Sequence, residues 1–128
     1  MKAVILAGGK GTRLAPYTTV FPKPLMPIDG MPILEILVRQ LAHFRIRDLI
    51  FTVSPQSAAL LSAYFGDGRK FGVDVCYSRE EKPLGTAGPL SLISGLTDTF
   101  LVMNGDILTT LNYEKLIRYH RQHRGMVT

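Results

Sequence analysis

The sequence predicts an α/β fold, a Rossmann-like three-layer sandwich built on a mainly parallel β-sheet. Short apolar runs typical of buried strands alternate with segments whose apolar residues recur at helical spacing. Clusters of Gly, Pro and Asp separate these segments. The chain has 128 residues, of which 46% are hydrophobic, enough for one core. Alternation of strands and helices favours parallel strands joined by helical crossovers.

The first half of the chain predicts two strands and two helices. Residues 2–7 form an apolar run without alternation, which indicates a strand buried on both faces. A long loop rich in Gly, Pro and Thr follows at 8–27, and a tight turn at 28–31. Pro32 suits the start of a helix at 33–45, because its missing N–H costs nothing there. The expected inner stripe of this helix is Ile33, Leu34, Leu37, Leu41 and Phe44.

A second strand and helix then complete this half. The strand is expected at 48–53, and the helix begins at Ser54-Pro55 and ends at the glycines of 66–68. The expected inner stripe of this helix is Leu60, Leu61, Tyr64 and Phe65.

The second half predicts two more strands and two more helices. A strand at 73–78 carries the single cysteine, Cys76, which cannot form an intrachain disulfide and is expected to be a buried thiol. A charged loop at 79–85 leads to a helix at 86–95, whose Pro89 falls in the first turn. The remaining elements are expected as a strand at 100–103, a helix at 113–123 and the start of another strand at 126–128.

The net charge of +5 favours anionic ligands. Because no run of consecutive Lys or Arg occurs, small phosphorylated ligands are favoured over nucleic acid. No apolar run reaches the length of a membrane span, and no cleavable leader is recognised at the N-terminus, so a cytoplasmic location and no membrane partner are expected.

Two predicted strands end in conspicuous polar sequences. Residues 2–7 lead into a turn containing Gly8, Gly9 and Gly11, and residues 100–103 lead into Asn104-Gly105-Asp106. Ligands of open α/β sheets bind beyond the carboxyl ends of the strands, so adjacent strands would bring these sequences to one crevice. A triphosphate beside a carboxylate is a setting for Mg²⁺, which makes Asp106 a candidate metal ligand. A turn-capping role for Asp106 fits its position equally well.

The glycine-rich turn departs from two common phosphate motifs. The Walker pattern fails because Gly9-Lys10 is followed by Gly11, where Ser or Thr is required. The dinucleotide pattern fails because Leu14 stands where its third glycine belongs. The sequence therefore supports neither a P-loop NTPase nor a nicotinamide dehydrogenase.

Three ordered segments together resemble the sugar-1-phosphate nucleotidyltransferases, or nucleoside-diphosphate-sugar pyrophosphorylases. These segments are AGGKGTRLAPYTTVFPKPLMPIDGMPIL, Glu81 to Gly88 (EKPLGTAG), and Val102 to Asp106 (VMNGD). The second is more similar to the mannose-1-phosphate guanylyltransferase branch than to the thymidylyl branch. The resemblance covers the whole chain and implies that it is the N-terminal nucleotide-binding part of such a catalytic domain.

The resemblance implies transfer of a nucleotidyl group from a nucleoside triphosphate to a sugar 1-phosphate, with Mg²⁺ as cofactor and release of pyrophosphate. A GDP-mannose product is favoured, and a dTDP- or UDP-glucose product stays open. By analogy, Asp106 holds Mg²⁺, Lys23 lies near the α-phosphate and the sugar phosphate, and Arg13 braces the pyrophosphate. The implied nucleotide-binding residues are Leu6, Ala7, Gly8, Gly9, Gly11, Thr12, Arg13, Glu80 or Glu81, Pro83 and Gly85.

Catalytic domains of the resembled family continue well beyond residue 128. The sequence is therefore expected to be incomplete at its C-terminus and to lack a second metal-binding carboxylate. An unpaired sheet edge would then favour self-association, as a homo-oligomer or by strand exchange. A non-catalytic nucleotide-binding or regulatory fragment is the alternative function.

Overall fold

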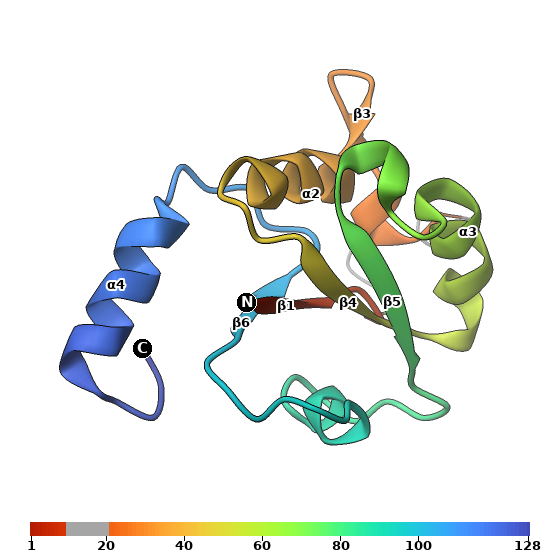
Figure 1. Cartoon of the computed structure of the whole chain (residues 1–128). Coiled ribbons are helices and arrows are strands. Elements are labelled where there is room, and N and C mark those ends of the chain that lie inside the picture. The colour runs from red at the N-terminus through yellow and green to blue at the C-terminus, as the bar shows by residue number, and fades with distance from the viewer. Residues whose placement is uncertain (10–20) are drawn as a thin grey trace.

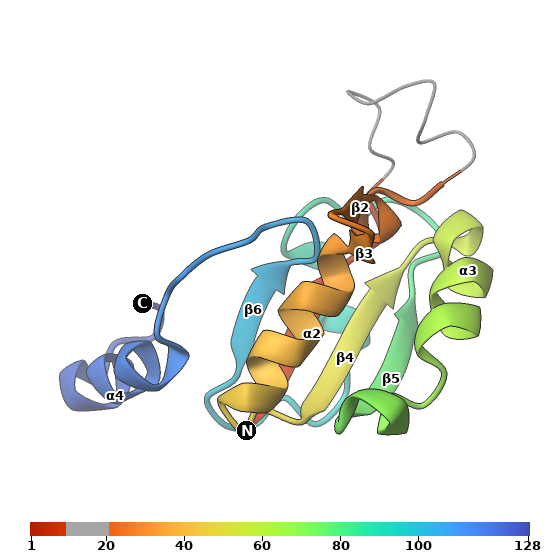
Figure 2. The same ribbon diagram turned by 90° about the horizontal axis from the view of Figure 1, so that it is seen from above.

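A parallel four-stranded sheet is the centre of the fold. The structure is a computed structural model that describes residues 1–9 and 21–128. The sheet has the order β5-β4-β1-β6, formed by β1 (Lys2–Leu6), β4 (Asp48–Val53), β5 (Asp74–Arg79) and β6 (Leu101–Asn104). All three pairings are parallel, so the carboxyl ends of the strands lie at one edge (Figure 2). The predicted α/β architecture is confirmed, and β6 pairs with β1, which is the arrangement that brings the two polar strand ends together.

The central strand β1 is buried on both faces, as its unbroken apolar run predicts. Ala3, Val4 and Ile5 are all fully buried. Leu6 pairs with Thr52 of β4 on one side and with Asn104 of β6 on the other. Three segments far apart in the sequence therefore meet at the end of β1.

Two helices cover one face of the sheet (Figure 1). Helix α2 (Ile33–His43) buries Leu34, Leu37 and Leu41, three residues of its predicted stripe, whereas Ile33 and Phe44 are only half-buried. Helix α3 (Pro55–Phe65) begins with a capping box in which the side chains of Ser54 and Ser57 bond reciprocally to backbone amides.

The inward side of α3 differs in part from the prediction. Leu61 and Phe65 are buried, but Leu60 is 40% exposed, so its place in the predicted stripe is wrong. The buried face instead runs through Ser57, Leu61 and Phe65 at spacings of four residues, and Leu60 lies beside this line.

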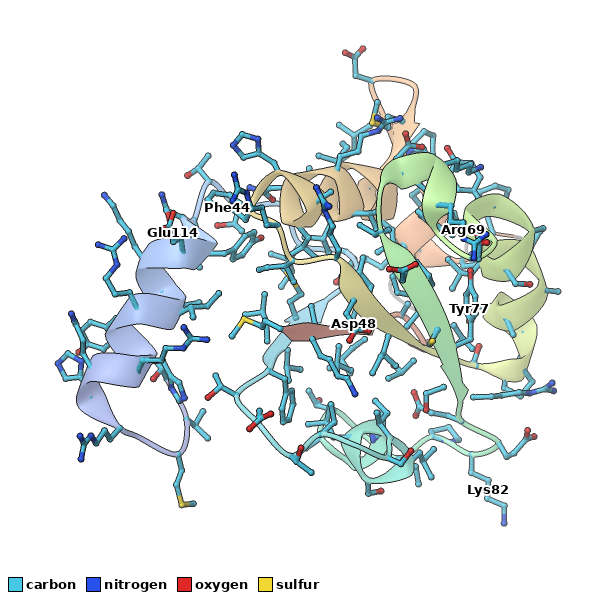
Figure 3. The ribbon with its side chains drawn as sticks, viewed as in Figure 1. Phe44, Asp48, Arg69, Tyr77, Lys82 and Glu114 are labelled. Atoms are coloured by element: carbon cyan, nitrogen blue, oxygen red, sulfur yellow. The ribbon has the colours of Figure 1, made fainter. Side chains whose placement is uncertain are left out.

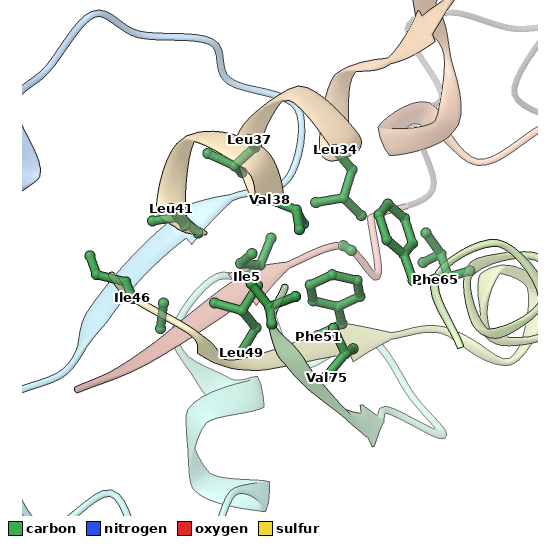
Figure 4. Close-up of a cluster of buried hydrophobic side chains, with 14 of the residues drawn as sticks. Ile5, Leu34, Leu37, Val38, Leu41, Ile46, Leu49, Phe51, Phe65 and Val75 are labelled. Carbon is green, nitrogen blue, oxygen red and sulfur yellow. The ribbon is translucent and has the colours of Figure 1, made fainter. Parts of the chain in front are cut away.

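The core lies between these helices and the sheet. Figure 4 shows Leu34, Leu37, Val38 and Leu41 of α2 above Ile5, Leu49 and Phe51 of the sheet. Phe51 also meets Phe65 edge to face, with ring centroids 5.2 Å apart. Alternation in β4 points Leu49, Phe51 and Val53 into this layer, and Thr52 to the opposite face of the sheet.

A buried carboxylate joins α2 to α3. The hydroxyl of Tyr64 donates to Glu35 Oε2, and Arg39 Nε donates to Glu35 Oε1 at 2.7 Å. Burial would raise the pKa of Glu35, but these hydrogen bonds and the charges of Arg39 and Lys70 outweigh it and lower that pKa. The pKa of Tyr64 is raised, mainly because its hydroxyl donates a hydrogen bond to Glu35 and also because the hydroxyl is buried.

Short elements connect the main ones. A 3₁₀ turn, η2 (Lys23–Leu25), precedes a hairpin of β2 (Pro27–Ile28) and β3 (Met31–Pro32). The hairpin contains the predicted tight turn, with positive φ at Asp29 (51°) and Gly30 (78°). A second 3₁₀ turn, η3 (Arg69–Phe71), lies between α3 and β5.

The predicted helix at 86–95 is wrong. Only a 3₁₀ turn forms there, η4 (Gly88–Leu92), on the sheet face opposite α2 (Figure 1). Pro89 has no N–H to donate, and Gly88 beside it disfavours a helix, so a longer α-helix does not propagate. The turn ends at Leu92, and the extended backbone of Ile93 and the positive φ of Gly95 (76°) lie outside the helical region.

Cys76 is exposed, which corrects the prediction of a buried thiol. Alternation along β5 places Val75 in the core and turns Cys76 to the other face of the sheet. Because β5 is also an edge strand of this sheet, that face is not covered at Cys76.

The last part of the described chain lies beside the sheet rather than on it. Helix α4 (Tyr113–His123) is confirmed at its predicted bounds and lies beyond β6 (Figure 1). Its buried Tyr113 packs edge to face on Phe44 and donates to Gln40 Oε1 at 3.3 Å. Residues 126–128 form no strand, contrary to prediction, because Met126 and Val127 are almost fully exposed and meet no neighbouring strand.

Candidate functional site

A cavity of about 660 Å³ lies at the carboxyl-end edge of the sheet. It is the place where ligands bind in open α/β sheets. The cavity is lined by the end of β1, the η2 turn, the start of α3, the loop after β5 and the end of β6. Its lining residues are Leu6, Ala7, Gly8, Gly9, Lys23, Pro24, Thr52, Ser54, Pro55, Gln56, Glu80, Glu81, Pro83, Leu84, Gly85, Thr86, Pro89, Asn104 and Asp106.

Lys23 and Asp106 form an ion pair in this cavity. Lys23 reaches it from η2, whose backbone is fixed where Leu25 N donates to Pro22 O at 2.9 Å and Leu25 is buried. The Lys23 side chain is 38% exposed and that of Asp106 is 25% exposed. Both charged groups are therefore held in place and open to a ligand.

The backbone of β1 positions Asp106. Gly105 N donates to Leu6 O at 3.0 Å, which continues the ladder of β1 and β6 by one rung. A Cβ at Gly105 would lie 3.3 Å from Ile5 Cγ2 and 3.4 Å from Leu6 O, so glycine permits this close approach. Asp106 follows directly and points its carboxylate into the cavity beside β1.

Glu80 is the most buried acidic group of the cavity, with 9% of its surface exposed. Its backbone N–H donates to Val53 O at 2.9 Å, immediately after β5. A Cβ at Gly8 would lie 2.7 Å from Glu80 Oε1, so the carboxylate lies directly against the backbone of Gly8. The end of β1 and the buried carboxylate thus form one wall.

A second acidic residue, Glu81, also lines the cavity but differs from Glu80. Its side chain is 74% exposed and pairs with Arg79, with 3.1 Å between Glu81 Oε1 and Arg79 Nε. Of the two glutamates considered from the sequence, Glu80 is the one whose buried carboxylate faces the end of β1. The loop then turns at Gly85, where φ is 75°.

The structure brings nine of the predicted site residues to this cavity. These residues are Leu6, Ala7, Gly8, Gly9, Lys23, Glu80, Pro83, Gly85 and Asp106. Gly11, Thr12 and Arg13 lie outside the described residues. The ligand roles assigned to all twelve stay predictions.

Sequence reasoning missed several lining residues. Thr52, Ser54, Pro55 and Gln56 come from the junction of β4 and α3. The same rule that selected the ends of β1 and β6 applies to every parallel strand, so the end of β4 at Val53 was a usable signal. The sequence that follows it, Ser-Pro-Gln, carries no charge and by itself predicts only the start of a helix.

The thiol, imidazole and carboxylate groups of residues 1–9 and 21–128 form no cluster of three or more suited to a metal. Asp106 lies in the cavity with Lys23 as its ion-pair partner and offers one carboxylate. This donor set fits Mg²⁺, which takes one or two carboxylates and completes its shell with phosphate oxygens and waters.

Among the helices of the described residues, none has the length and apolar character needed to cross a membrane.

The cavity and the parallel sheet define a class of α/β protein that binds its ligand at the carboxyl ends of its strands. Residues 2–128 match the family model described as "Nucleotidyl transferase". The chain therefore belongs to the nucleotidyl transferase family, and the family predicted from its three motifs is confirmed.

Similar curated proteins are mannose-1-phosphate guanylyltransferases. One from Mycobacterium tuberculosis (strain ATCC 25618 / H37Rv) is 41% identical over 128 residues, covering 98% of this chain. The catalytic subunit beta from Xenopus tropicalis is 39% identical over 127 residues, covering 96% of this chain. In both cases the chain spans 35% of the relative's length.

Similar solved structures share the fold. A protein described as a glucose-1-phosphate thymidylyltransferase from Bacillus anthracis, in complex with a sucrose, has a TM-score of 0.85 and 28% identity over 95% of this chain and 50% of that one. HddC from Yersinia pseudotuberculosis, complexed with GMP-PN, has a TM-score of 0.76 and 32% identity over 93% of this chain and 53% of that one.

Proposed function

We propose that this chain forms the nucleotide-binding part of a sugar-1-phosphate nucleotidyltransferase, which makes a nucleoside-diphosphate sugar and releases pyrophosphate. The observation that carries the proposal is the ion pair of Lys23 and Asp106 in a cavity formed by the ends of parallel strands. One group suits a phosphate and the other suits a phosphate-bound cation. Relatives named as mannose-1-phosphate guanylyltransferases support the same reaction class.

The reaction needs alignment and charge neutralisation more than covalent chemistry. An oxygen of the sugar phosphate attacks the α-phosphorus, a new P–O bond forms, and the bond to the bridging oxygen of pyrophosphate breaks. Lys23 can stabilise the negative charge as it shifts from the attacking sugar phosphate to the departing pyrophosphate, because its ammonium is a compact point charge on a flexible side chain. Holding both anions in line lowers the barrier by orienting the reactants.

Asp106 would hold Mg²⁺, which supplies charge neutralisation for the triphosphate when bound. Asp106 fits this ion because it offers one carboxylate and leaves other positions to phosphate and water. Arg13 would brace the pyrophosphate with its planar, permanently charged guanidinium.

A guanine base is favoured over other bases by Glu80. A carboxylate only accepts hydrogen bonds, and the edge of guanine offers adjacent N1–H and N2–H donors. The Glu80 carboxylate is buried against Gly8, at the wall where backbone groups of Leu6 to Gly9 are proposed to hold the nucleoside. Adenine offers no such pair of donors on that edge and would leave the buried carboxylate unmatched.

Nucleotide binding is tested by calorimetry and thermal shift with GTP, dTTP, UTP, CTP and ATP, each with Mg²⁺. GTP is expected to bind most tightly. A Glu80→Gln variant is expected to lose affinity for GTP about tenfold or more, since charged hydrogen bonds are worth about 1.5–3 kcal/mol. Glu81→Gln is the matched control, because Glu81 is exposed and already pairs with Arg79. Equal losses in both variants would remove Glu80 from base recognition.

Turnover is tested by pyrophosphate release from GTP with mannose 1-phosphate and Mg²⁺. Because the chain spans about a third of its curated relatives, the assay is run on this chain and on any longer protein that contains it. Binding with release supports the transferase. Binding without release by either protein would favour the non-catalytic nucleotide-binding alternative.

A further inference from the structure

Lys23 and Asp106, which are proposed to bind different parts of the ligand, form an ion pair with each other. Lys23 is proposed to meet phosphate and Asp106 to meet the metal, and both lie inside the cavity. We propose that this pair is an exchange lock, which opens more readily when a cation and a polyphosphate arrive together than when either arrives alone. The inference rests on the proposed function. It adds that the site binds the complex of metal and nucleotide in preference to the metal alone or the nucleotide alone.

The backbone on both sides of the pair is fixed, so the exchange involves side chains. Lys23 lies in a 3₁₀ turn where Met26 N donates to Lys23 O at 3.0 Å, next to the buried Pro24. Asp106 follows Gly105, whose amide donates to Leu6 O. Both side chains are partly exposed, so a ligand can reach each of them without unfolding either segment.

Binding of the cation alone or of the triphosphate alone is electrostatically unfavourable in part, because it leaves one charge of the pair without a partner. A free divalent cation that takes Asp106 must displace Lys23 and leaves its ammonium beside the new positive charge. A metal-free triphosphate that takes Lys23 leaves the Asp106 carboxylate facing an anion. When both arrive, phosphate oxygens take Lys23 and the metal takes Asp106, so every charge keeps a partner. Metal and nucleotide therefore strengthen each other's binding by the same factor.

The metal arm of the test uses Mn²⁺ without nucleotide, measured by electron paramagnetic resonance at low ionic strength. Lys23→Met frees Asp106 and is expected to tighten Mn²⁺ binding about three- to fivefold, the scale of a partly exposed ion pair. Lys82→Met is the control, because it removes the same charge from an exposed side chain that points into solvent (Figure 3). Added salt should shrink the difference.

The nucleotide arm uses GTP in EDTA, measured by calorimetry. Asp106→Asn frees Lys23 and is expected to tighten metal-free GTP about three- to fivefold. The same variant should weaken GTP in the presence of Mg²⁺, so its two effects have opposite signs. Asp98→Asn is the charge-matched control, since Asp98 is an exposed residue outside the cavity. Thermal melts of all four variants verify that each is folded.

The two arms separate this inference from the proposed function. If no nucleoside triphosphate binds with Mg²⁺, the proposed function fails, and the Mn²⁺ arm still decides whether Lys23 occludes Asp106. Tighter Mn²⁺ binding by Lys23→Met, and not by Lys82→Met, supports the lock. Unchanged, weaker or undetectable binding in both variants overturns it.

Discussion

Replacing Thr52 by Val should stabilise the protein, although Thr52 lies in the wall of the cavity. Thr52 is 1% exposed, and its hydroxyl oxygen has no hydrogen-bond partner among residues 1–9 and 21–128. A buried polar group left without a partner costs about 1–3 kcal/mol. Valine has the same shape, and it replaces the hydroxyl by a methyl group that gains from burial.

The expected gain is about 1 kcal/mol at the melting temperature. A domain of this length has an unfolding entropy of about 270 cal mol⁻¹ K⁻¹, so the Tm should rise by about 4 °C. Thermal unfolding followed by circular dichroism measures the shift. Because the hydroxyl is closed off from solvent, the additional shift caused by GTP with Mg²⁺ should be the same in both proteins.

Thr109→Val is the matched control for this experiment. It makes the same chemical change where the hydroxyl has a partner, since Thr109 Oγ1 accepts from Leu111 N at 3.1 Å. This variant should lower the Tm or leave it unchanged. A lower Tm for Thr52→Val would refute the reasoning, because it would mean that water or another group satisfies the Thr52 hydroxyl.

Four further predictions concern other parts of the molecule. Tyr64→Phe removes a hydrogen bond to Glu35 and should cost about 1–2 kcal/mol at pH 7. Because the pKa of Glu35 is lowered in the folded state, this stabilisation is present above the ordinary glutamate pKa and lost as the pH falls through the lowered value, so urea melts of the two proteins should converge on acidification. Gly8→Ala should displace the Glu80 carboxylate and weaken GTP about tenfold by calorimetry while the fold is retained; full GTP affinity would contradict the geometry. Arg13→Ala should weaken GTP more than GMP, and equal losses would argue against a pyrophosphate role. Light scattering should detect association at high concentration, because β6 pairs only with β1 among the described residues, whereas a monomer at every concentration would rule this out.

Strong local patterns were enough to predict most of the fold. The unbroken apolar run of β1 and the helical spacing of Leu34, Leu37 and Leu41 each specify one element and its buried side. The errors occur where the outcome depends on distant parts of the chain. Cys76 alternates as a strand residue should, but only the positions of α2 and α3 decide which face of β5 is covered.

The candidate site was predictable in composition and less so in arrangement. The polar sequence after β6 made Asp106 a candidate site residue, the family resemblance added Lys23, and both lie in the cavity. The bond between them was not predictable, because the two are far apart in the sequence and meet only through the sheet order. Thr52 lies at the end of β4, where the rule for parallel strands applies, but its own apolar surroundings in the sequence do not distinguish a cavity wall from a core strand.

The central place of β1 has a consequence for how the protein folds. Its partners in the sheet, β4 and β6, lie about 50 and about 100 residues further along the chain, so each pairing forms only after a large loop has closed, and both pairings require two such closures. The cavity needs both pairings, because Gly8 follows β1, Glu80 bonds to the end of β4 and Asp106 follows β6. Nucleotide binding should therefore appear late in refolding, and stopped-flow mixing with a fluorescent GTP analogue would time the completion of the sheet.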